Sequence, residues 1–226
     1  MGCREAGEPL MIAVFEHAPG QGDGIVDAIQ SVDNQLQVTM VKAYESLDHP
    51  NQIDGVVLSG GPMSVLDIDT EALSFMREEV ALLRQLIDKG VPVLGICLGH
   101  QLLAHIAGGQ ISRCAAPEIG CRDIIWDADG TSRPVFQWHE DEVSVPPEHT
   151  QTIATSASCR VQALQYLDRP MISVQFHPEV DERRGQYLVE TRAPAGVDVA
   201  GCSMRVDQEF RLSVFAQFIQ LVRAGR

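Results

Sequence analysis

Cys97 lies in a short segment whose pattern is typical of a catalytic nucleophile. The segment Gly95-Ile96-Cys97-Leu98-Gly99 follows an apolar strand-like run and precedes an apolar helical run. Glycines two residues before and after Cys97 leave room for a sharp strand-to-helix turn, which holds the central side chain above the strand ends in a strained backbone conformation. The first turn of the following helix also stabilises negative charge on the sulfur. The alternative is a buried cysteine flanked by glycines that serve packing alone.

The base that a cysteine nucleophile requires is best supplied by His177 among the seven histidines of the chain. His177 and Glu179 end an apolar strand-like run, with Pro178 between them. Residues two apart on an extended chain point to the same face, so the Glu179 carboxylate can orient the His177 ring and stabilise its imidazolium form. This His-x-Glu pattern alone is more often two solvated residues at a strand end. Combined with Cys97 it predicts a catalytic triad. His100, one helical turn beyond Cys97, is expected to be structural, and His139 is the more serious competitor for the role of base.

Attack of a thiolate on an amide places negative charge on the carbonyl oxygen, which requires preorganised hydrogen-bond donors. The backbone N–H of Leu98, directly after the nucleophile, is one expected donor. The second expected donor is the N–H of Gly61 in the loop Ser59-Gly60-Gly61-Pro62, because glycine lets the backbone approach a substrate closely. Gly60 in the same loop is expected to contact the substrate. An ordinary turn is the alternative interpretation of this loop.

Alternating strand-like and helix-like segments in the first half of the chain predict an α/β fold that can position these groups. Buried parallel strands appear in a sequence as short apolar runs, and amphipathic helices as apolar residues at helical spacing. On this basis strands are expected at 10–15, 36–41, 53–58 and 91–96, and helices at 25–32 and 71–89. The expected architecture is a mainly parallel sheet with helices on both faces, formed by a single domain of residues 1–226.

The second half of the chain changes to short β-like segments, which suit hairpins or edge strands better than further crossover units. They lie at 123–126, 134–138, 151–155, 161–166 and 171–176 and predict a small antiparallel β extension of the sheet. A long surface loop is expected from Val180 to Asp207, with a lid or a partner contact as the alternatives for this segment. From Asp207 the apolar residues return to helical spacing, so a final helix is expected to dock on the sheet.

Composition limits the classes of partner and cofactor. Acidic residues outnumber Lys and Arg by 31 to 17, and the formal net charge of −14 disfavours binding to nucleic acid or to an anionic membrane. No run approaches the roughly 20 apolar residues that a membrane span needs, and the opening segment lacks a signal-peptide pattern, so a cytoplasmic location is expected. The six scattered cysteines are expected to be reduced, and the spacing of Cys114 and Cys121 is unlike that of structural zinc sites. Neither a metal nor an organic cofactor is expected.

Three motifs of the chain resemble those of the class I, triad-type glutamine amidotransferases. Gly95-Ile96-Cys97-Leu98-Gly99-His100-Gln101 is similar to the nucleophile motif of that family, Phe176-His177-Pro178-Glu179 to its second motif, and the loop at 59–62 to its oxyanion loop. The motifs occur in the same order, and the resemblance extends from the first strand to Glu179. It implies a flavodoxin-like fold and an enzyme that hydrolyses the side-chain amide of glutamine through a γ-glutamyl thioester, releasing ammonia without a cofactor.

The resemblance also implies substrate contacts. Gln101 should hold the α-carboxylate or the amine end of glutamine, and His139 and Asp141 should line the glutamine pocket. Glu140 departs from the family, whose members often have glycine there, and is expected to face solvent rather than the ammonium group of the substrate. Met63 stands where several members carry a further glycine, so no contact is carried over to it.

Two functions of the triad remain open from the sequence. One is an amidotransferase subunit that delivers ammonia to a separate synthase, since no second domain that would use the ammonia is expected in this chain. The other is a stand-alone hydrolase or peptidase that acts on a γ-glutamyl conjugate. The segment from Trp138 to Asp141 resembles relatives of the glutaminase domain of GMP synthase more than those that serve anthranilate synthesis, which leaves the acceptor undefined. A non-catalytic binding module is disfavoured by the complete triad.

Overall fold

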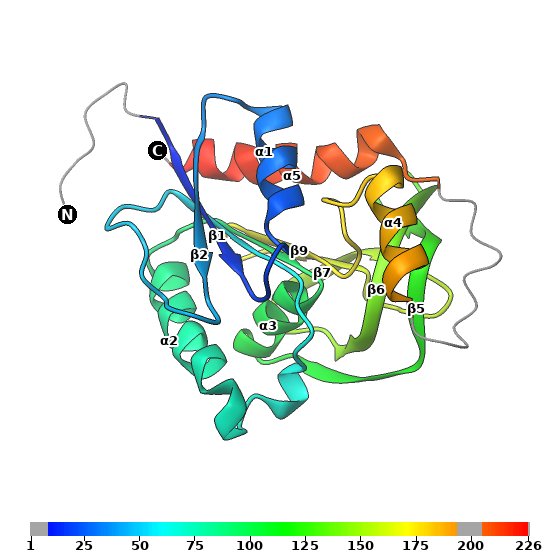
Figure 1. Ribbon diagram of the computed structural model, residues 1–226, viewed down its shortest axis with the longest axis horizontal. Coiled ribbons are helices and arrows are strands. Elements are labelled where there is room, and N and C mark those ends of the chain that lie inside the picture. Colours follow the sequence, from blue (N-terminus) through cyan, green and yellow to red (C-terminus); the bar gives the residue numbers. More distant parts are fainter. Residues whose placement is uncertain (1–8, 194–204, 226) are drawn as a thin grey trace.

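The computed structural model describes residues 9–193 and 205–225, which are organised around one mixed sheet of nine strands (Figure 1). The strands are β1 (Met11–Glu16), β2 (Gln37–Lys42), β3 (Gly55–Leu58), β4 (Val93–Ile96), β5 (Gln110–Trp126), β6 (Thr131–Val145), β7 (Thr150–Thr155), β8 (Ala163–Tyr166) and β9 (Met171–Val174). The helices are α1 (Asp23–Val32), α2 (Ser74–Asp88), α3 (Leu98–Ile106), α4 (Glu182–Arg192) and α5 (Gln208–Ala224), with short 3-10 turns η1 (Val65–Asp67) and η2 (Glu71–Leu73). In space the strand order is β2-β1-β3-β4-β9-β8-β7-β5-β6.

One end of the sheet is parallel, as the sequence predicts. β1 pairs with β2 and β3, β3 pairs with β4, and β4 pairs with β9, all in parallel. Alternate residues of β1 enter two apolar layers: Ile12 and Val14 pack in the layer that includes α1 and α5, and Ala13 and Phe15 in the layer that includes α2 and α3. Helices therefore cover both faces of the sheet, which confirms the expected α/β architecture.

The other end of the sheet is antiparallel and more extensive than predicted. β5 and β6 form a long hairpin over residues 110–145, where only short segments at 123–126 and 134–138 were expected. Register shifts interrupt the hairpin, one of them between Arg113 and Glu118. Such irregularities break the alternation of apolar and polar residues on which a strand prediction depends. β7 and β8 then join the hairpin to β9 through antiparallel pairs.

Residues 171–174 form β9, which makes an expected antiparallel hairpin with β8. It is not an edge strand, because it also pairs with β4 and is buried along its whole length. One expectation for the later part of the chain is wrong. The surface loop expected from Val180 to Asp207 contains α4. Asp181 begins this helix by accepting a 2.7 Å hydrogen bond from the Arg184 backbone N–H, and an aspartate in this position is a capping signal that favours a helix over a loop. Residues 194–204, which were expected to belong to the same surface loop, lie outside the described ranges.

The cysteines that the structure describes, at positions 97, 114, 121 and 159, are thiols that form no disulfide with one another. Cys3 and Cys202 fall outside the described residues. Within the ranges 9–193 and 205–225, no helix combines the length and the apolar character needed to cross a membrane.

Candidate active site

Cys97 occupies a sharp turn between β4 and α3, in a strained backbone conformation of the kind that the sequence predicts. Its φ of 52° and ψ of −105° lie in a region that residues with a side chain rarely adopt. A Cβ atom added at Gly95 would lie 2.5 Å from the Gly99 carbonyl oxygen, and one added at Gly99 would lie 2.6 Å from the Leu58 Cβ atom. Close packing around the turn therefore requires both glycines, and the turn places Cys97 at the N-terminus of α3.

His177 and Glu179 form a buried pair just beyond the end of β9. Nδ1 of His177 lies 2.7 Å from Oε1 of Glu179. Burial lowers the pKa of His177, but the charges of Glu179 and Cys97, together with the hydrogen bond to Glu179, raise this pKa well above its ordinary value of 6.5. The backbone N–H of His177 donates to the Phe136 carbonyl oxygen at 2.8 Å, which ties this segment to β6. The structure thus brings Cys97, His177 and Glu179 together from separate segments.

The loop Ser59-Gly60-Gly61-Pro62 follows β3 and packs directly against these groups. A Cβ atom added at Gly60 would lie 2.9 Å from Cε1 of His177 and 3.6 Å from Cβ of Cys97. A Cβ atom added at Gly61 would lie 2.9 Å from Cδ2 of Leu98. The backbone of the loop therefore approaches His177 and Leu98 more closely than residues with side chains would allow. This arrangement can offer backbone donors to a substrate oxygen.

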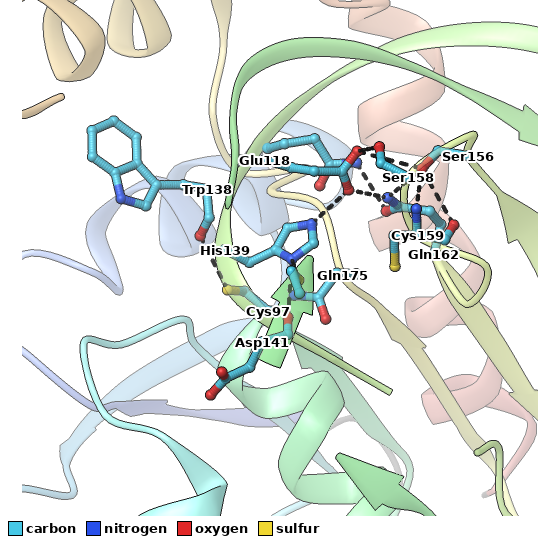
Figure 2. Close-up of polar contacts among 12 residues, drawn as sticks. Cys97, Glu118, Trp138, His139, Asp141, Ser156, Ser158, Cys159, Gln162 and Gln175 are labelled. Atoms are coloured by element: carbon cyan, nitrogen blue, oxygen red, sulfur yellow. Dashed lines mark hydrogen bonds and ion pairs between the residues drawn. The ribbon is translucent and has the colours of Figure 1, made fainter. Parts of the chain in front are cut away.

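The segment of β6 that contains His139 and Asp141 forms a wall beside Cys97 (Figure 2). The Cys97 thiol donates to the Trp138 carbonyl oxygen at 3.6 Å, and Nδ1 of His139 lies 2.9 Å from the backbone oxygen of Asp141. The amide nitrogen of Gln101 donates to that same Asp141 oxygen at 2.9 Å and to the side-chain oxygen of Gln175 at 3.1 Å. The amide nitrogen of Gln101 is thus engaged within the protein and supports the wall.

The Asp141 carboxylate is held by two partners that were not expected from the sequence. Ser64 donates its hydroxyl to Oδ2 at 2.5 Å, and the Arg113 guanidinium lies 2.9 Å from Oδ1. Both partners come from segments far from Asp141 in sequence, so no local pattern could have indicated them. Glu140, in contrast, is exposed to solvent, as expected.

A buried polar cluster on β5, β6 and the β7–β8 connection supports His139 from behind (Figure 2). Glu118 accepts hydrogen bonds from Nε2 of His139 at 2.9 Å and from the Gln162 amide at 3.0 Å, and also from the Ser158 hydroxyl. Burial raises the pKa of Glu118, but the hydrogen bonds from His139 and Ser158 outweigh burial and lower it. Glu118 therefore remains a carboxylate that fixes the His139 ring.

The same cluster contains a set of potential metal ligands. Atoms of Glu118, His139 and Cys159 lie within 4.8 Å of one another. Burial raises the pKa of the Cys159 thiol, which therefore keeps its proton and donates to the Val161 carbonyl oxygen at 3.6 Å. Because hydrogen-bond donors already surround the Glu118 carboxylate, the cluster is satisfied as a protein network. Its geometry supports a structural role for these groups.

Comparison with known proteins identifies the family of this chain. The sequence profile of the family described as Glutamine amidotransferase class-I matches residues 23–192, well over half of the chain. The chain belongs to this family. A subunit of the glutamine-hydrolysing GMP synthase of Saccharolobus solfataricus is 37% identical to this class I glutamine amidotransferase over 150 residues, which cover 63% of this chain and 76% of that protein. The corresponding subunit from Methanothermobacter thermautotrophicus is 35% identical over 143 residues, covering 60% and 70% of the two chains.

Solved structures of amidotransferases share the fold. A glutamine amidotransferase from Thermotoga maritima has a TM-score of 0.76 at 22% identity and covers 95% of this chain and 99% of that chain. A protein described as a putative GMP synthase subunit from Thermoplasma acidophilum has a TM-score of 0.73 at 22% identity and covers 98% of each chain. These likenesses confirm the flavodoxin-like fold. As a class I glutamine amidotransferase, the chain is an enzyme that hydrolyses glutamine.

Replacement of Gly60 by alanine is expected to lower the turnover number for glutamate release by about 10²-fold. The new Cβ atom would lie 2.9 Å from Cε1 of His177, so the ring must move, and a displacement of about 1 Å at a reacting group can have an effect of this size. Steady-state assays of glutamate release will measure the change. Gly225→Ala is the matched control, because its Cβ atom would make only ordinary contacts near 3.8 Å. Equal turnover in both variants would contradict the close approach of the loop to His177.

Proposed function

We propose that this amidotransferase hydrolyses glutamine through a Cys97, His177 and Glu179 triad and delivers the ammonia to a separate synthase. The observation that best supports the triad is the position of Cys97. Its strained turn places the thiol at the N-terminus of α3, beside a buried imidazole whose other nitrogen lies 2.7 Å from a carboxylate. A strained nucleophile, a base and a group that orients the base are the three parts that covalent acyl transfer requires.

In the proposed cycle the Cys97 sulfur attacks the amide carbon after its proton has passed to His177. The backbone N–H groups of Gly61 and Leu98 stabilise the resulting oxyanion. His177 then gives a proton to the leaving nitrogen, and ammonia departs as the γ-glutamyl thioester forms. Water, activated by the same histidine, attacks the thioester and releases glutamate. Glu179 keeps the ring oriented and stabilises its protonated form in both halves of the cycle.

The remaining proposed substrate contacts are Gly60, Gln101, His139 and Asp141. Since the Gln101 amide nitrogen is bonded within the protein, its contact with substrate would come from the carbonyl oxygen, an acceptor suited to the α-ammonium group. His139 and Asp141 belong to the wall that β6 forms beside Cys97. No step of the proposed cycle needs a metal or an organic cofactor.

The proposal of a separate synthase is supported by the names of the relatives. The matched proteins from Saccharolobus solfataricus and Methanothermobacter thermautotrophicus are described as subunits of the glutamine-hydrolysing GMP synthase, and the matches cover 76% and 70% of their lengths. These matches extend over most of the length of a separate synthase subunit, whereas the match to the single-chain GMP synthase of Nitratidesulfovibrio vulgaris covers 24% of that protein. We infer that the ammonia produced at Cys97 passes to a second protein.

The proposal is tested by measuring glutamate release by the purified chain, first alone and then with the synthase component of one of these relatives and its substrates. Slow hydrolysis of glutamine that rises on addition of the partner is the expected result. A panel of γ-glutamyl dipeptides serves as the comparison. A kcat/KM above about 10⁴ M⁻¹s⁻¹ on one of these conjugates, without any partner present, lies within the ordinary range for enzymes and would instead indicate a stand-alone γ-glutamyl hydrolase.

A further inference from the structure

A third buried histidine–carboxylate pair, besides His177–Glu179 and His139–Glu118, lies beneath the loop that contains Gly60 and Gly61. Nε2 of His17, just after β1, lies 3.0 and 3.1 Å from the two carboxylate oxygens of Glu79 in α2. The side chains of both residues are completely buried. The proposed chemistry uses neither group. A fully buried ion pair is expensive to desolvate and contributes little net stability, so its presence requires another explanation.

The other side of the His17 ring faces the backbone of the loop. Nδ1 of His17 lies 2.9 Å from the Ser59 carbonyl oxygen and 3.2 Å from the Ser59 hydroxyl oxygen. The Ser59 hydroxyl accepts the His17 backbone N–H at 3.1 Å and donates to the Gly60 carbonyl oxygen at 2.7 Å. Both carbonyl groups are therefore held on the side of the loop that faces His17.

The orientation of the Gly60 carbonyl determines the orientation of the Gly61 N–H. The two groups belong to one planar trans peptide and point in opposite directions. Holding the Gly60 oxygen toward Ser59 and His17 turns the Gly61 N–H away from them. Two adjacent glycines would otherwise leave this peptide free to rotate, because glycine accepts most backbone conformations.

We propose that His17, Glu79 and Ser59 are positioning residues that hold the Gly60–Gly61 peptide in the orientation needed to stabilise the oxyanion. This inference rests on the proposed function of Gly61 as an oxyanion donor. The ion pair has a specific part in the arrangement, since only a protonated imidazole can donate from both ring nitrogens, one to Glu79 and one to the loop. Burial lowers the pKa of His17, but Glu79 and the two carbonyl groups raise it above its ordinary value.

The test compares Glu79→Gln and Ser59→Ala with the wild type in two reactions of Cys97. Hydrolysis of glutamine forms an oxyanion, whereas alkylation by iodoacetamide is a direct displacement of iodide and forms none. Removal of a complete oxyanion donor lowers turnover by about 10²- to 10³-fold. Each of the two variants removes only a contact that orients the Gly61 N–H, so kcat for glutamine is expected to fall by roughly 10- to 100-fold, with little change in KM. Alkylation of Cys97 is expected to keep the wild-type rate. Glu78→Gln is the matched control, because it removes the same charge from the neighbouring residue in α2 and should leave both reactions unchanged.

The rate at which p-nitrophenyl acetate acylates Cys97 tests this inference independently of the proposed function. The Cys97 thiolate attacks the ester carbonyl, p-nitrophenolate leaves, and an acetyl thioester forms through an oxyanion, whatever the natural substrate is. If the wild type fails to hydrolyse glutamine, the proposed function fails, and a slower acylation in Glu79→Gln and Ser59→Ala still supports the positioning role. Wild-type kcat or acylation in both folded variants would overturn the inference. Parallel losses of acylation and alkylation would also overturn it, because they would indicate a general structural defect.

Discussion

Replacement of Cys97 by alanine or serine is expected to abolish glutamate release, with a loss of roughly 10⁴-fold or more in kcat, the scale seen when a covalent nucleophile is removed. The fold should remain intact. The sharp turn at Cys97 depends on the spacing of the backbone around Gly95 and Gly99 and not on the hydrogen bond of the sulfur to the Trp138 carbonyl oxygen. Steady-state assays will measure the activity, and thermal unfolding monitored by circular dichroism will measure the fold.

The matched control for this prediction is Cys121→Ala. Cys121 is also a buried thiol outside any disulfide, and it packs with Phe136, Val180 and Val206 in a small apolar cluster. Its replacement should leave most of the activity in place. Wild-type turnover in Cys97→Ala, or an equal loss in Cys121→Ala, would be incompatible with Cys97 as the nucleophile.

Replacement of His177 by alanine is expected to reduce kcat by a similar factor of roughly 10⁴ or more, since both proton transfers of the cycle pass through its ring. Glu179→Gln should cause a loss about 10- to 100-fold smaller, because an amide oxygen can still accept from Nδ1 and partly orient the ring. Equal losses in the two variants would show that the roles of base and orienting group are assigned wrongly. Steady-state kinetics with glutamine give both values.

The pKa of His177 provides an independent measurement on the same pair. Glu179 is one of the groups that raise this pKa well above 6.5, so Glu179→Gln should lower it, which NMR titration of the imidazole can detect. The sign of the effect on stability follows from linkage. Because the pKa is higher in the folded state than the ordinary 6.5, the pair stabilises the fold fully below about pH 6.5, and this stabilisation is lost as the pH rises through the folded-state pKa. Glu179→Gln should therefore reduce the free energy of unfolding more at about pH 6 than at alkaline pH.

The parallel part of the fold could be predicted because each buried strand produces a local signal. The residues of β3 and β4 form apolar runs that end at glycine-containing loops, and both strands are buried along their whole length. The position of β9 could not be predicted in this way. A run of four buried residues does not specify its neighbours, and β9 lies between β4 and β8 because of pairings that join distant segments.

The same distinction between local sequence patterns and contacts of distant segments applies to the candidate site. Cys97, Gly61 and the His177–Glu179 pair belong to short motifs whose local geometry follows from spacing of one or two residues. The groups that hold these motifs in place come from elsewhere: Glu79 lies 62 residues from His17, and Glu118 lies 21 residues from His139. Such partners leave no periodic pattern, so the structure was needed to find them.

The backbone conformation of Cys97 also implies a conflict between thermodynamic stability and catalysis. A residue with a side chain held at φ 52° and ψ −105° typically raises the free energy of the folded state by about 1–3 kcal/mol. Glycine at this position would remove most of that energy, but it would remove the reactive sulfur as well. Selection for thermal resistance alone would therefore favour an inactive protein. The rest of the molecule, above all the closely packed glycines around this turn, must remain stable enough to tolerate the strain that the nucleophile introduces.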